Sequence, residues 1–570
     1  MSTVHYTFDV TRPHTHLIHV EMNVPAHEGA SMDLVMPAWL PGAYKIFDNA
    51  RNLRNFEAQD LNGQPLRFER IDWQTWRVHH HGVAAVVTYQ VFANKPEIHQ
   101  GQLDAHHAFL NPGTLGLYVD GHKEDWAVTL QMVMPEDWRA ATGLAPTGPC
   151  TFKAAHYEEF IDCPLQLGEF EMATFSIDGI DYEVVYEGHT PFSPGALVPS
   201  LKKMIKACTE LWGRPPLERY VFQYLETGAD FLNGLEHRNS TIITGPIADP
   251  SRFDGLIAIT THEFVHLWNV KRLRPVGLGP FDYTREAHTT GLWVVEGLTE
   301  YYTDLLVLRA GLQQPVHYLS SVAGHIQELE AMPGRRNMSL EEASWTTWHF
   351  GDDRWNGALN YYVKGYLLGV ALDLELRGRS DNQVSLDDVM RAMWDAYGAV
   401  DRAYEPDDVC RMAESLLGES MDDFWGPYLK GREDFDWQRF LGHAGLLLIE
   451  AEATPALQIV PKPVDGGLRL ENVLAGGAAQ EAGLMIGDVI VAIDGVKATP
   501  RLLGELGLQF EPGEVVNVHY FRRDRLWTTE LTLGRTAHYA IMPNPQATPA
   551  QQALRADWLA PVGTRAGAQV

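Results

Sequence analysis

Cysteine is scarce in this chain of 570 residues, which holds only four cysteines at widely separated positions: Cys150, Cys163, Cys208 and Cys410. No two of them form a C-x-x-C pair. The sequence therefore predicts neither a thiolate zinc site nor a disulfide framework. We expect the four thiols to be reduced and mostly buried.

Basic residues are also in deficit, because 45 lysines and arginines stand against 74 acidic residues and the formal net charge is −29. This balance excludes the basic face that nucleic-acid binding requires, so no nucleic-acid partner is expected. It is compatible with a substrate that carries a free ammonium group. Long apolar runs and a signal-peptide pattern are both missing. We therefore expect no membrane span and a cytoplasmic location.

The length of the chain exceeds what one hydrophobic core can hold, so several domains are expected. The hydrophobic content of 45% is that of a globular protein. Alternating segments predict strands in the first region, and a mixed pattern then gives way to helical periodicity. The predicted fold is multidomain α+β, with a β-rich N-terminal domain over residues 1–175, a mixed sheet and helical lobe over 176–445, a module over 446–540, and a loosely ordered Pro/Ala/Gln-rich tail over 541–570.

The most informative pattern is the run His262-Glu263-Phe264-Val265-His266, which reads H-E-x-x-H. On a helix the two histidines lie one turn apart on one face, so both imidazoles can reach a single Zn²⁺ at about 2.0–2.1 Å. Glu263 lies beside them, where its carboxylate can take a proton from the attacking water. Apolar neighbours predict a buried helix that ends near Arg274-Pro275. The alternative is a buried helix with two hydrogen-bonded histidines and no metal.

A third ligand is offered by Glu296, which falls within the apolar band of a helix predicted over residues 289–302. Two histidines and one carboxylate leave an open position for water, which is typical of catalytic zinc sites. Glu300 lies four residues further on, where it can accept a hydrogen bond from the far nitrogen of a ligating histidine. A carboxylate paired with an arginine is the alternative for Glu296, and a solvated helix carboxylate is the alternative for Glu300.

The H-E-x-x-H run followed by Trp293-x-x-Glu296-Gly297 resembles the gluzincin metallopeptidases, whose third ligand is a glutamate on a following helix. The gap of 29 residues between His266 and Glu296 is longer than in the alanyl/leucyl aminopeptidases. That gap, the segment Pro37–Tyr44 and a C-terminal PDZ-like module are instead similar to the glycyl aminopeptidase family. The resemblance covers nearly the whole chain. It implies a thermolysin-like zincin catalytic domain that holds one Zn²⁺ per chain.

Two further motifs acquire a role through this resemblance. The run Gly234-Leu235-Glu236-His237-Arg238-Asn239 resembles the G-x-M-E-N substrate strand of related aminopeptidases. It implies that the backbone at Gly234 pairs with the peptide and that Glu236 holds the α-amino group, although His237 stands where the relatives have asparagine. A surface turn is the alternative.

The run Tyr362-Val363-Lys364-Gly365 resembles the Y-x-K-G element, whose tyrosine donates to the oxyanion. Tyr362 matches that tyrosine. Tyr361 and Tyr366 are near enough in sequence to serve instead, and packing in a helical lobe is the alternative for all three.

Residues 468–495 combine a strand, a small-residue helix and a G-D-x-I-x-x-I-x-G hairpin, and this combination resembles a PDZ domain. Such domains add a peptide strand to a sheet edge and bind the terminal carboxylate in a loop. The run Gly445-Leu446-Leu447-Leu448 is one candidate for that loop. A peptide C-terminus is thus a second expected partner, and a purely structural appendage is the alternative.

Taken together, these residues predict a zinc aminopeptidase that acts on peptides with a free N-terminus. His262, His266 and Glu296 are the predicted metal ligands, and Glu263 is the predicted general base. The family resemblance implies a preference for small N-terminal residues, glycine and alanine. An endopeptidase that recruits polypeptides through the PDZ-like module is the first rival hypothesis, and a non-catalytic PDZ adaptor is the second.

Overall fold

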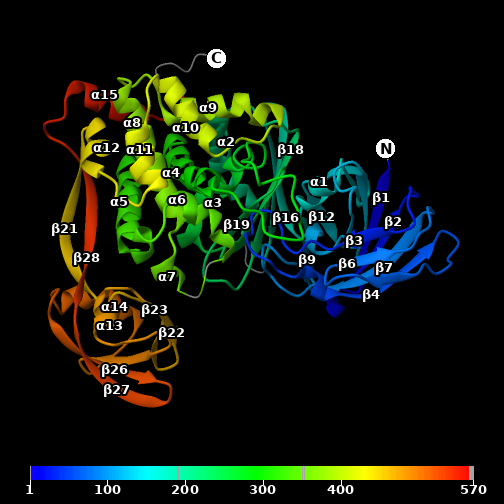
Figure 1. Ribbon diagram of the computed structural model, residues 1–570, viewed down its shortest axis with the longest axis horizontal. Helices are drawn as coiled ribbons and strands as arrows, with labels where there is room; N and C mark the ends of the chain where they lie inside the picture. The colour runs from blue at the N-terminus through cyan, green and yellow to red at the C-terminus, as the bar shows by residue number, and fades with distance from the viewer. Residues whose placement is uncertain (1, 189–191, 350, 352, 564–570) are drawn as a thin grey trace. The chain divides into compact units, whose positions relative to one another are not determined.

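The computed structural model of the chain describes residues 2–188, 192–349, 351 and 353–563. The chain forms two compact units (Figure 1). The first comprises Met1–His288 and Trp394–Tyr404, and the second comprises Thr289–Met393 and Glu405–Val570. The first unit contains most of the strands, whereas the second contains most of the helices and a smaller β-module.

The N-terminal part of the first unit is β-rich, as predicted. A seven-stranded sheet runs in the order β13-β14-β11-β1-β2-β7-β4, and two four-stranded sheets run in the orders β10-β3-β6-β5 and β12-β15-β9-β8. Ile18, Val20 and Met22 of β2 are buried while His19 and Glu21 are exposed, which is the alternation of a half-buried strand. The elements are β1 (Thr3–Asp9), β2 (Leu17–Val24), β3 (Met32–Val35), β4 (Leu53–Asp60), β5 (Phe68–Arg70), β6 (Thr75–Val78), β7 (Ala85–Phe92), β8 (Gln102–Leu103), β9 (His107–Leu110), β10 (Tyr118–Val119), β11 (Ala127–Val133), β12 (Arg139–Thr142), β13 (Ala145–Gly148), β14 (Thr151–Ala154), α1 (Tyr157–Ile161) and β15 (Leu165–Gly168).

A five-stranded mixed sheet completes the strands of the first unit, in the order β16-β17-β18-β20-β19. The strands β17 (Ile180–Glu187), β18 (Arg219–Glu226) and β20 (Ser240–Gly245) are parallel neighbours. The strands β16 (Glu171–Ile177) and β19 (Asn233–Glu236) lie antiparallel at the two edges. Because β19 is an edge strand, one side of its backbone faces away from the sheet.

Two helices accompany this sheet, α2 (Val198–Trp212) and α3 (Phe253–Val265). The helix α3 packs on β19 and β20, and α2 packs on α3. The prediction that the second helix continues to Arg274-Pro275 is wrong, because α3 ends at Val265. The N–H of Leu267 bonds to the carbonyl of Phe264 at 3.1 Å, which tightens the last turn, and residues 266–272 then form successive turns.

The second unit opens with a short π-helix, η6 (Trp293–Leu298), which leads directly into α4 (Thr299–Arg309). The single helix predicted over residues 289–302 is therefore divided in two. The longest helix, α8 (Tyr361–Arg379), is buried along most of its length. Among the helices of the described ranges, none combines the length and the apolar content needed to cross a bilayer. The remaining helices are α5 (Pro315–Ala331), α6 (Leu340–Trp345), α7 (Arg354–Gly357), α9 (Leu386–Ala396), α10 (Asp407–Leu417), α11 (Asp422–Trp425) and α12 (Trp437–His443).

The β-module of the second unit follows α12 and is reached through a two-stranded ribbon of β21 (Leu446–Ala456) and β28 (Gly534–Pro543) (Figure 1). Its sheet has the order β22-β23-β24-β26-β27 and surrounds an apolar core of its own. The candidate loop at Gly445–Leu448 is wrong, because Leu446, Leu447 and Leu448 pair with β28. The remaining elements of the module are β22 (Ile459–Val464), β23 (Gly467–Val473), α13 (Ala478–Glu481), β24 (Val489–Ile493), β25 (Val496–Lys497), α14 (Pro500–Gly504), β26 (Val515–Arg522) and β27 (Arg525–Thr532).

The segment that follows the module is ordered, and the prediction of a loose tail is wrong for its described residues. After β28 the chain forms α15 (Pro549–Trp558), whose N-terminus is stabilised by a capping box between Thr548 and Gln551. Trp558 is fully buried, and its indole N–H donates to the hydroxyl of Tyr301 at 3.2 Å. The helix α15 thus packs on the helical lobe from which the module departs.

Candidate active site

The last turn of α3 carries His262, and His266 is the residue that caps the C-terminus of this helix. The ring centroids of His262 and His266 lie 4.7 Å apart at an interplanar angle of 80°. The Nδ1–H of His266 donates to the backbone carbonyl of Asn269 at 2.7 Å, which fixes the tautomer in which Nε2 carries the lone pair. An imidazole whose one nitrogen is held by a hydrogen bond presents its other nitrogen in a fixed direction, as a metal ligand requires. The turns after α3 supply this bond, because they bring the carbonyl of Asn269 back toward the ring.

Glu263 is buried on the same turn and contacts the substrate strand predicted from sequence. A β-carbon placed on Gly234 of β19 would lie 2.7 Å from Cδ and 2.8 Å from Cγ of Glu263. One carboxylate oxygen each from Glu236 and Glu263 and a ring nitrogen of His266 all lie within 4.8 Å of one another. The structure therefore brings four of the predicted residues together within the first unit, at the edge of the sheet.

Glu236 is 5% exposed and lies against the N-terminal segment that the sequence comparison singled out. A β-carbon on Gly42 would lie 2.9 and 3.0 Å from its two carboxylate oxygens. Gly42 has a φ of +86°, which side chains other than glycine rarely adopt. On another side the Nζ of Lys271 lies 3.7 Å from Oε1 of Glu236. The backbone of Gly42 and the Lys271 ammonium thus hold this carboxylate in place.

Asp162 and Lys271 form a buried ion pair that the sequence reasoning missed. The Nζ of Lys271 donates to Oδ1 of Asp162 at 2.8 Å, and the same carboxylate bonds to Nδ1 of His237 and to the backbone N–H of Arg238, both at 3.1 Å. Burial opposes the charge on Asp162, but Lys271 and His237 outweigh it and lower the pKa of Asp162 to about 2. Burial likewise opposes the charge on Lys271, yet Asp162 and Glu236 keep its pKa above the ordinary value.

Two carboxylates, Asp162 and Glu236, share the Lys271 ammonium, and the buried guanidinium of Arg272 also interacts with Asp162. The Glu236 carboxylate lies beside Glu263 and His266, where a partly desolvated carboxylate attracts a cation more strongly than it would in water. The arrangement can therefore bind one cationic group at Glu236.

In the second unit Glu296 is 3% exposed and lies on the π-helix η6. The residue after it, Gly297, crosses α8 at Gly365, and a β-carbon on Gly297 would lie 2.5 Å from the Cα of Gly365. Two glycines let the backbones of η6 and α8 approach this closely. Short π-helical insertions are frequent at functional sites. Glu300 follows in the first turn of α4 and is half-buried.

The crossing at Gly365 also brings Tyr361, one of three tyrosines near the start of α8, close to η6 and Glu296. The hydroxyl of Tyr361 accepts a hydrogen bond from Thr347 at 3.2 Å, and burial together with the charge of Glu296 raises the pKa of Tyr361. The hydroxyl of Tyr366 is buried and donates to Asp304 at 3.0 Å. Tyr362 is half-buried, and its backbone N–H donates to the side chain of the N-cap residue Asn360 at 2.9 Å. Tyr361 and Tyr366 are thus engaged in structural contacts, and the ring of Tyr362 stacks on that of Tyr361 with centroids 4.9 Å apart.

Comparison with known proteins places this site in a family. Residues 5–169 match the peptidase M61 N-terminal domain, and residues 255–368 match the M61 glycyl aminopeptidase domain. A search of curated proteins finds no match.

Several solved structures are similar to this chain. An aminopeptidase N family protein from Idiomarina loihiensis is 27% identical, with a TM-score of 0.90 over 98% of this chain and 100% of that one. An M1 zinc metallopeptidase from Deinococcus radiodurans shares the fold at 14% identity, with a TM-score of 0.51 over 76% of this chain and 95% of that one. A variant of the same enzyme, 15% identical with a TM-score of 0.51 over 76% of this chain and 94% of that one, is bound to a Tyr-Ser-Ala substrate. The chain therefore contains the two domains that the M61 family models describe, the N-terminal domain and the glycyl aminopeptidase domain, and it is a metallopeptidase.

Proposed function

We propose that this metallopeptidase is a zinc-dependent aminopeptidase that releases the N-terminal residue of a peptide. The observation that carries the proposal is the position of Glu236, whose carboxylate is buried and lies within 4.8 Å of Glu263 and His266. A carboxylate beside the reacting groups binds the α-ammonium of a substrate and discriminates against chains without one.

We propose His262, His266 and Glu296 as the ligands of one Zn²⁺, because two imidazoles and one carboxylate are a donor set typical of catalytic zinc. Glu236, Glu263 and His266 also offer one ligand atom each within 4.8 Å of one another, but Glu263 and Glu236 are better used as base and ammonium receptor. When bound, the zinc would act as a Lewis acid and lower the pKa of water. Glu300 is proposed to orient a ligating histidine.

In this mechanism Glu263 acts first as a base and then as an acid. Its carboxylate takes a proton from the water whose oxygen attacks the carbonyl carbon of the first peptide bond. The hydroxyl of Tyr362 donates to the oxyanion that forms. Glu263 then delivers the proton to the leaving nitrogen as the C–N bond breaks, which yields a free amino acid and a peptide with a new N-terminus.

The edge strand β19 also supports cleavage after the first residue of the peptide. Its backbone can pair with an extended peptide, as in β-strand addition, and its last residue is Glu236. A peptide paired along β19 would have its N-terminus held by Glu236, close to Glu263. The family description, glycyl aminopeptidase, supports a preference for small N-terminal residues such as glycine and alanine.

The β-module is proposed to be a PDZ-like peptide-binding module over residues 446–540, following an N-terminal domain over 1–175 and a catalytic region over 176–445. Its strand β23, small-residue helix α13 and hairpin β24–β25 coincide with the motif residues. Its sheet has edge strands at β22 and β27, to either of which a peptide strand can add.

A panel of chromogenic aminoacyl substrates tests the activity, with and without a metal chelator. We expect hydrolysis of substrates with a free α-amino group, no hydrolysis of their N-acetylated forms, and loss of activity on chelation that zinc restores. The variant Glu236→Ala should lose most activity on free substrates while keeping its metal. Full activity of Glu236→Ala, or equal cleavage of acetylated and free substrates, would contradict the aminopeptidase proposal. The variant Glu263→Gln serves as the inactive reference.

A further inference from the structure

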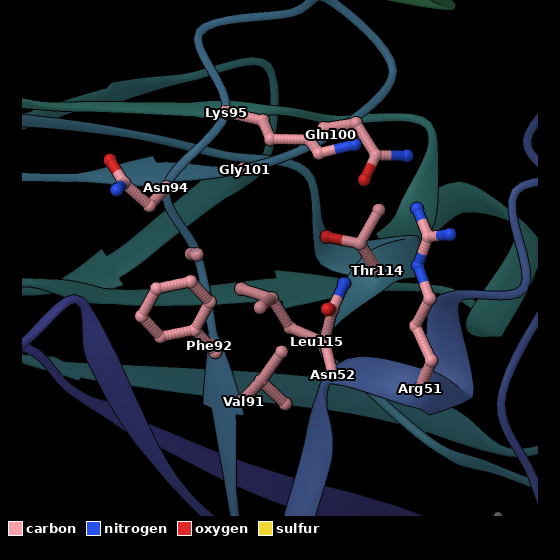
Figure 2. Close-up of a pocket in the computed structure, with 11 residues that line it drawn as sticks. Arg51, Asn52, Val91, Phe92, Asn94, Lys95, Gln100, Gly101, Thr114 and Leu115 are labelled. Carbon is pink, nitrogen blue, oxygen red and sulfur yellow. The ribbon is translucent and has the colours of Figure 1, made fainter.

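A second pocket lies in the N-terminal part of the first unit and contains none of the residues assigned to the active site. It is formed by the turn before β4, the end of β7, the loop that leads to β8, and the turn that ends at Thr114 and Leu115 (Figure 2). The lining residues that matter here are Arg51, Lys95, Gln100, Thr114 and Phe92. The figure shows Arg51, Gln100 and Thr114 gathered on one side of the pocket.

The charge of this pocket is unusual for the chain. Arg51 and Lys95 line it, and neither side chain has an ion pair or hydrogen-bond partner among the described residues. No carboxylate of the described residues belongs to the lining. Asp48 lines a separate shallow depression with Arg51 but forms no ion pair with it. In a chain with a net charge of −29, two unpaired cations in one pocket indicate a site for an anion.

The carboxamide of Gln100 is a second and independent indication. Gln100 is 3% exposed, and its Nε2 is buried without a hydrogen-bond partner among the described residues. An unsatisfied buried donor is costly, so a native structure retains one only for a reason. A half-turn of the carboxamide places its oxygen at this buried position, where an acceptor without a partner costs less than a donor does, and it turns the N–H group toward the pocket. A bound acceptor would satisfy this donor together with Arg51 and Lys95.

The wall opposite these donors is apolar and consists of Val91, Phe92 and Leu115 (Figure 2). We propose that this pocket binds a small oxyanion, a carboxylate or a phosphate group, that is carried on an apolar or aromatic body. The guanidinium of Arg51 matches the planar pair of oxygens that both groups present, and Lys95 adds a point charge. The apolar wall would contact the body of the same ligand.

Calorimetric titration of the full-length protein with phenyl phosphate and with phenylacetate tests this proposal, and chloride at equal ionic strength serves as the baseline. The test variant is Arg51→Gln/Lys95→Gln. The matched control is Arg12→Gln/Lys153→Gln, which removes the same charge from two exposed residues of the same unit. Thermal unfolding of the unaltered protein and of both variants verifies that each is folded. We expect both variants to fold, because every altered side chain is exposed.

We expect one saturable site per chain for at least one probe, with a dissociation constant at least tenfold higher in the test variant and unchanged in the control. The two probes distinguish the chemistry, because preference for phenyl phosphate indicates a phosphate ester and preference for phenylacetate indicates a carboxylate. The proposal is overturned if neither probe binds saturably above the chloride baseline. It is equally overturned if the test variant binds as tightly as the unaltered protein, because the signal then arises elsewhere, for example at the metal site.

Discussion

Gly234 and Glu263 are in direct contact across the interface between the edge strand β19 and the helix α3. The Glu263 side chain lies over the Cα of Gly234, in the space that any larger residue would fill. The strand proposed to hold the substrate and the proposed base are therefore packed together. A movement of β19 at Gly234 would therefore also displace the side chain of Glu263.

Replacing Gly234 with alanine should displace Glu263. The added methyl group would meet Cγ and Cδ of Glu263 at 2.7–2.8 Å, which is closer than carbon atoms approach in proteins. A general base contributes roughly 10²–10⁴-fold to the rate, so we expect kcat to fall about 100-fold with unchanged zinc content. Gly228→Ala is the control, because no heavy atom lies within 4 Å of its added β-carbon. Equal activity of the two variants would show that Glu263 is not the base.

Replacing Asp162 with asparagine should weaken substrate binding. Lys271 would lose its closest partner and turn toward Glu236, which would cancel the charge proposed to hold the α-ammonium. We expect KM for free aminoacyl substrates to rise about tenfold, which corresponds to about 1.4 kcal/mol, with little change in kcat. Asp137→Asn is the control, since Asp137 is exposed. An unchanged KM would mean that Asp162 has no role in positioning Glu236.

The same pair predicts how stability depends on pH. The pKa of Asp162 is lowered to about 2 from an unfolded value of about 3.9, so its stabilisation is present above pH 4 and is lost as the pH falls through about 2. The shift corresponds to about 2.6 kcal/mol. The free energies of unfolding in urea of the unaltered protein and of Asp162→Asn should therefore differ most above pH 4 and converge toward pH 2. A difference that stays constant across this range would show that the ionisation of Asp162 does not stabilise the fold.

Replacing Gly365 with alanine should separate η6 from α8. The new β-carbon would lie 2.7 Å from the Cα of Gly297 and 3.2 Å from the carbonyl oxygen of Trp293, and backbone atoms cannot yield without moving a helix. Overpacking of this kind costs about 1–3 kcal/mol. Because Glu296 and Tyr362 flank this crossing, we also expect zinc affinity to fall at least tenfold, measured by competition with a chelator. Gly324→Ala, on the exposed side of α5, should leave zinc affinity unchanged.

Replacing Trp558 with alanine should destabilise the second unit. The fully buried indole would leave a cavity, and such truncations cost about 3–5 kcal/mol. We expect a lower Tm and faster proteolysis after β28. Trp527→Ala is the control, because Trp527 is 49% exposed on β27. Equal Tm values for the two variants would mean that α15 does not contribute to the stability of the lobe.

Local patterns predicted much of this fold because many of its elements carry a clear periodicity. The alternation in β2 and the apolar strand β18 were readable from single segments, and so was the H-E-x-x-H turn. The end of α3 was not, because residues 266–273 contain no glycine or proline. There the helix ends through a backbone hydrogen bond that tightens the last turn, and no particular residue type in the sequence marks such a turn.

Other features needed information that lies far away in the sequence. Asp162 and Lys271 are more than a hundred positions apart, and no local motif connects a turn after α1 with the turns after α3. The π-helix at Glu296 was also hidden, because six residues are too few to separate its period from that of an α-helix. The composition of the last segment was misleading, since Thr548 and Gln551 form a capping box that outweighs the prolines around it.

The ribbon of β21 and β28 is the connection through which the chain enters and leaves the β-module. Because the two strands are paired, the chain enters and leaves the β-module at points separated by a single strand spacing, about 4.8 Å. The module is therefore an insertion into a hairpin, and a short turn could replace it without altering α12, α15 or the helices between which they pack. Loss or exchange of such an insertion would remove the hydrogen bonds that Asn356 of α7 makes to Asn472, Val473 and Ala475 of the module, while α12 and α15 would keep their places.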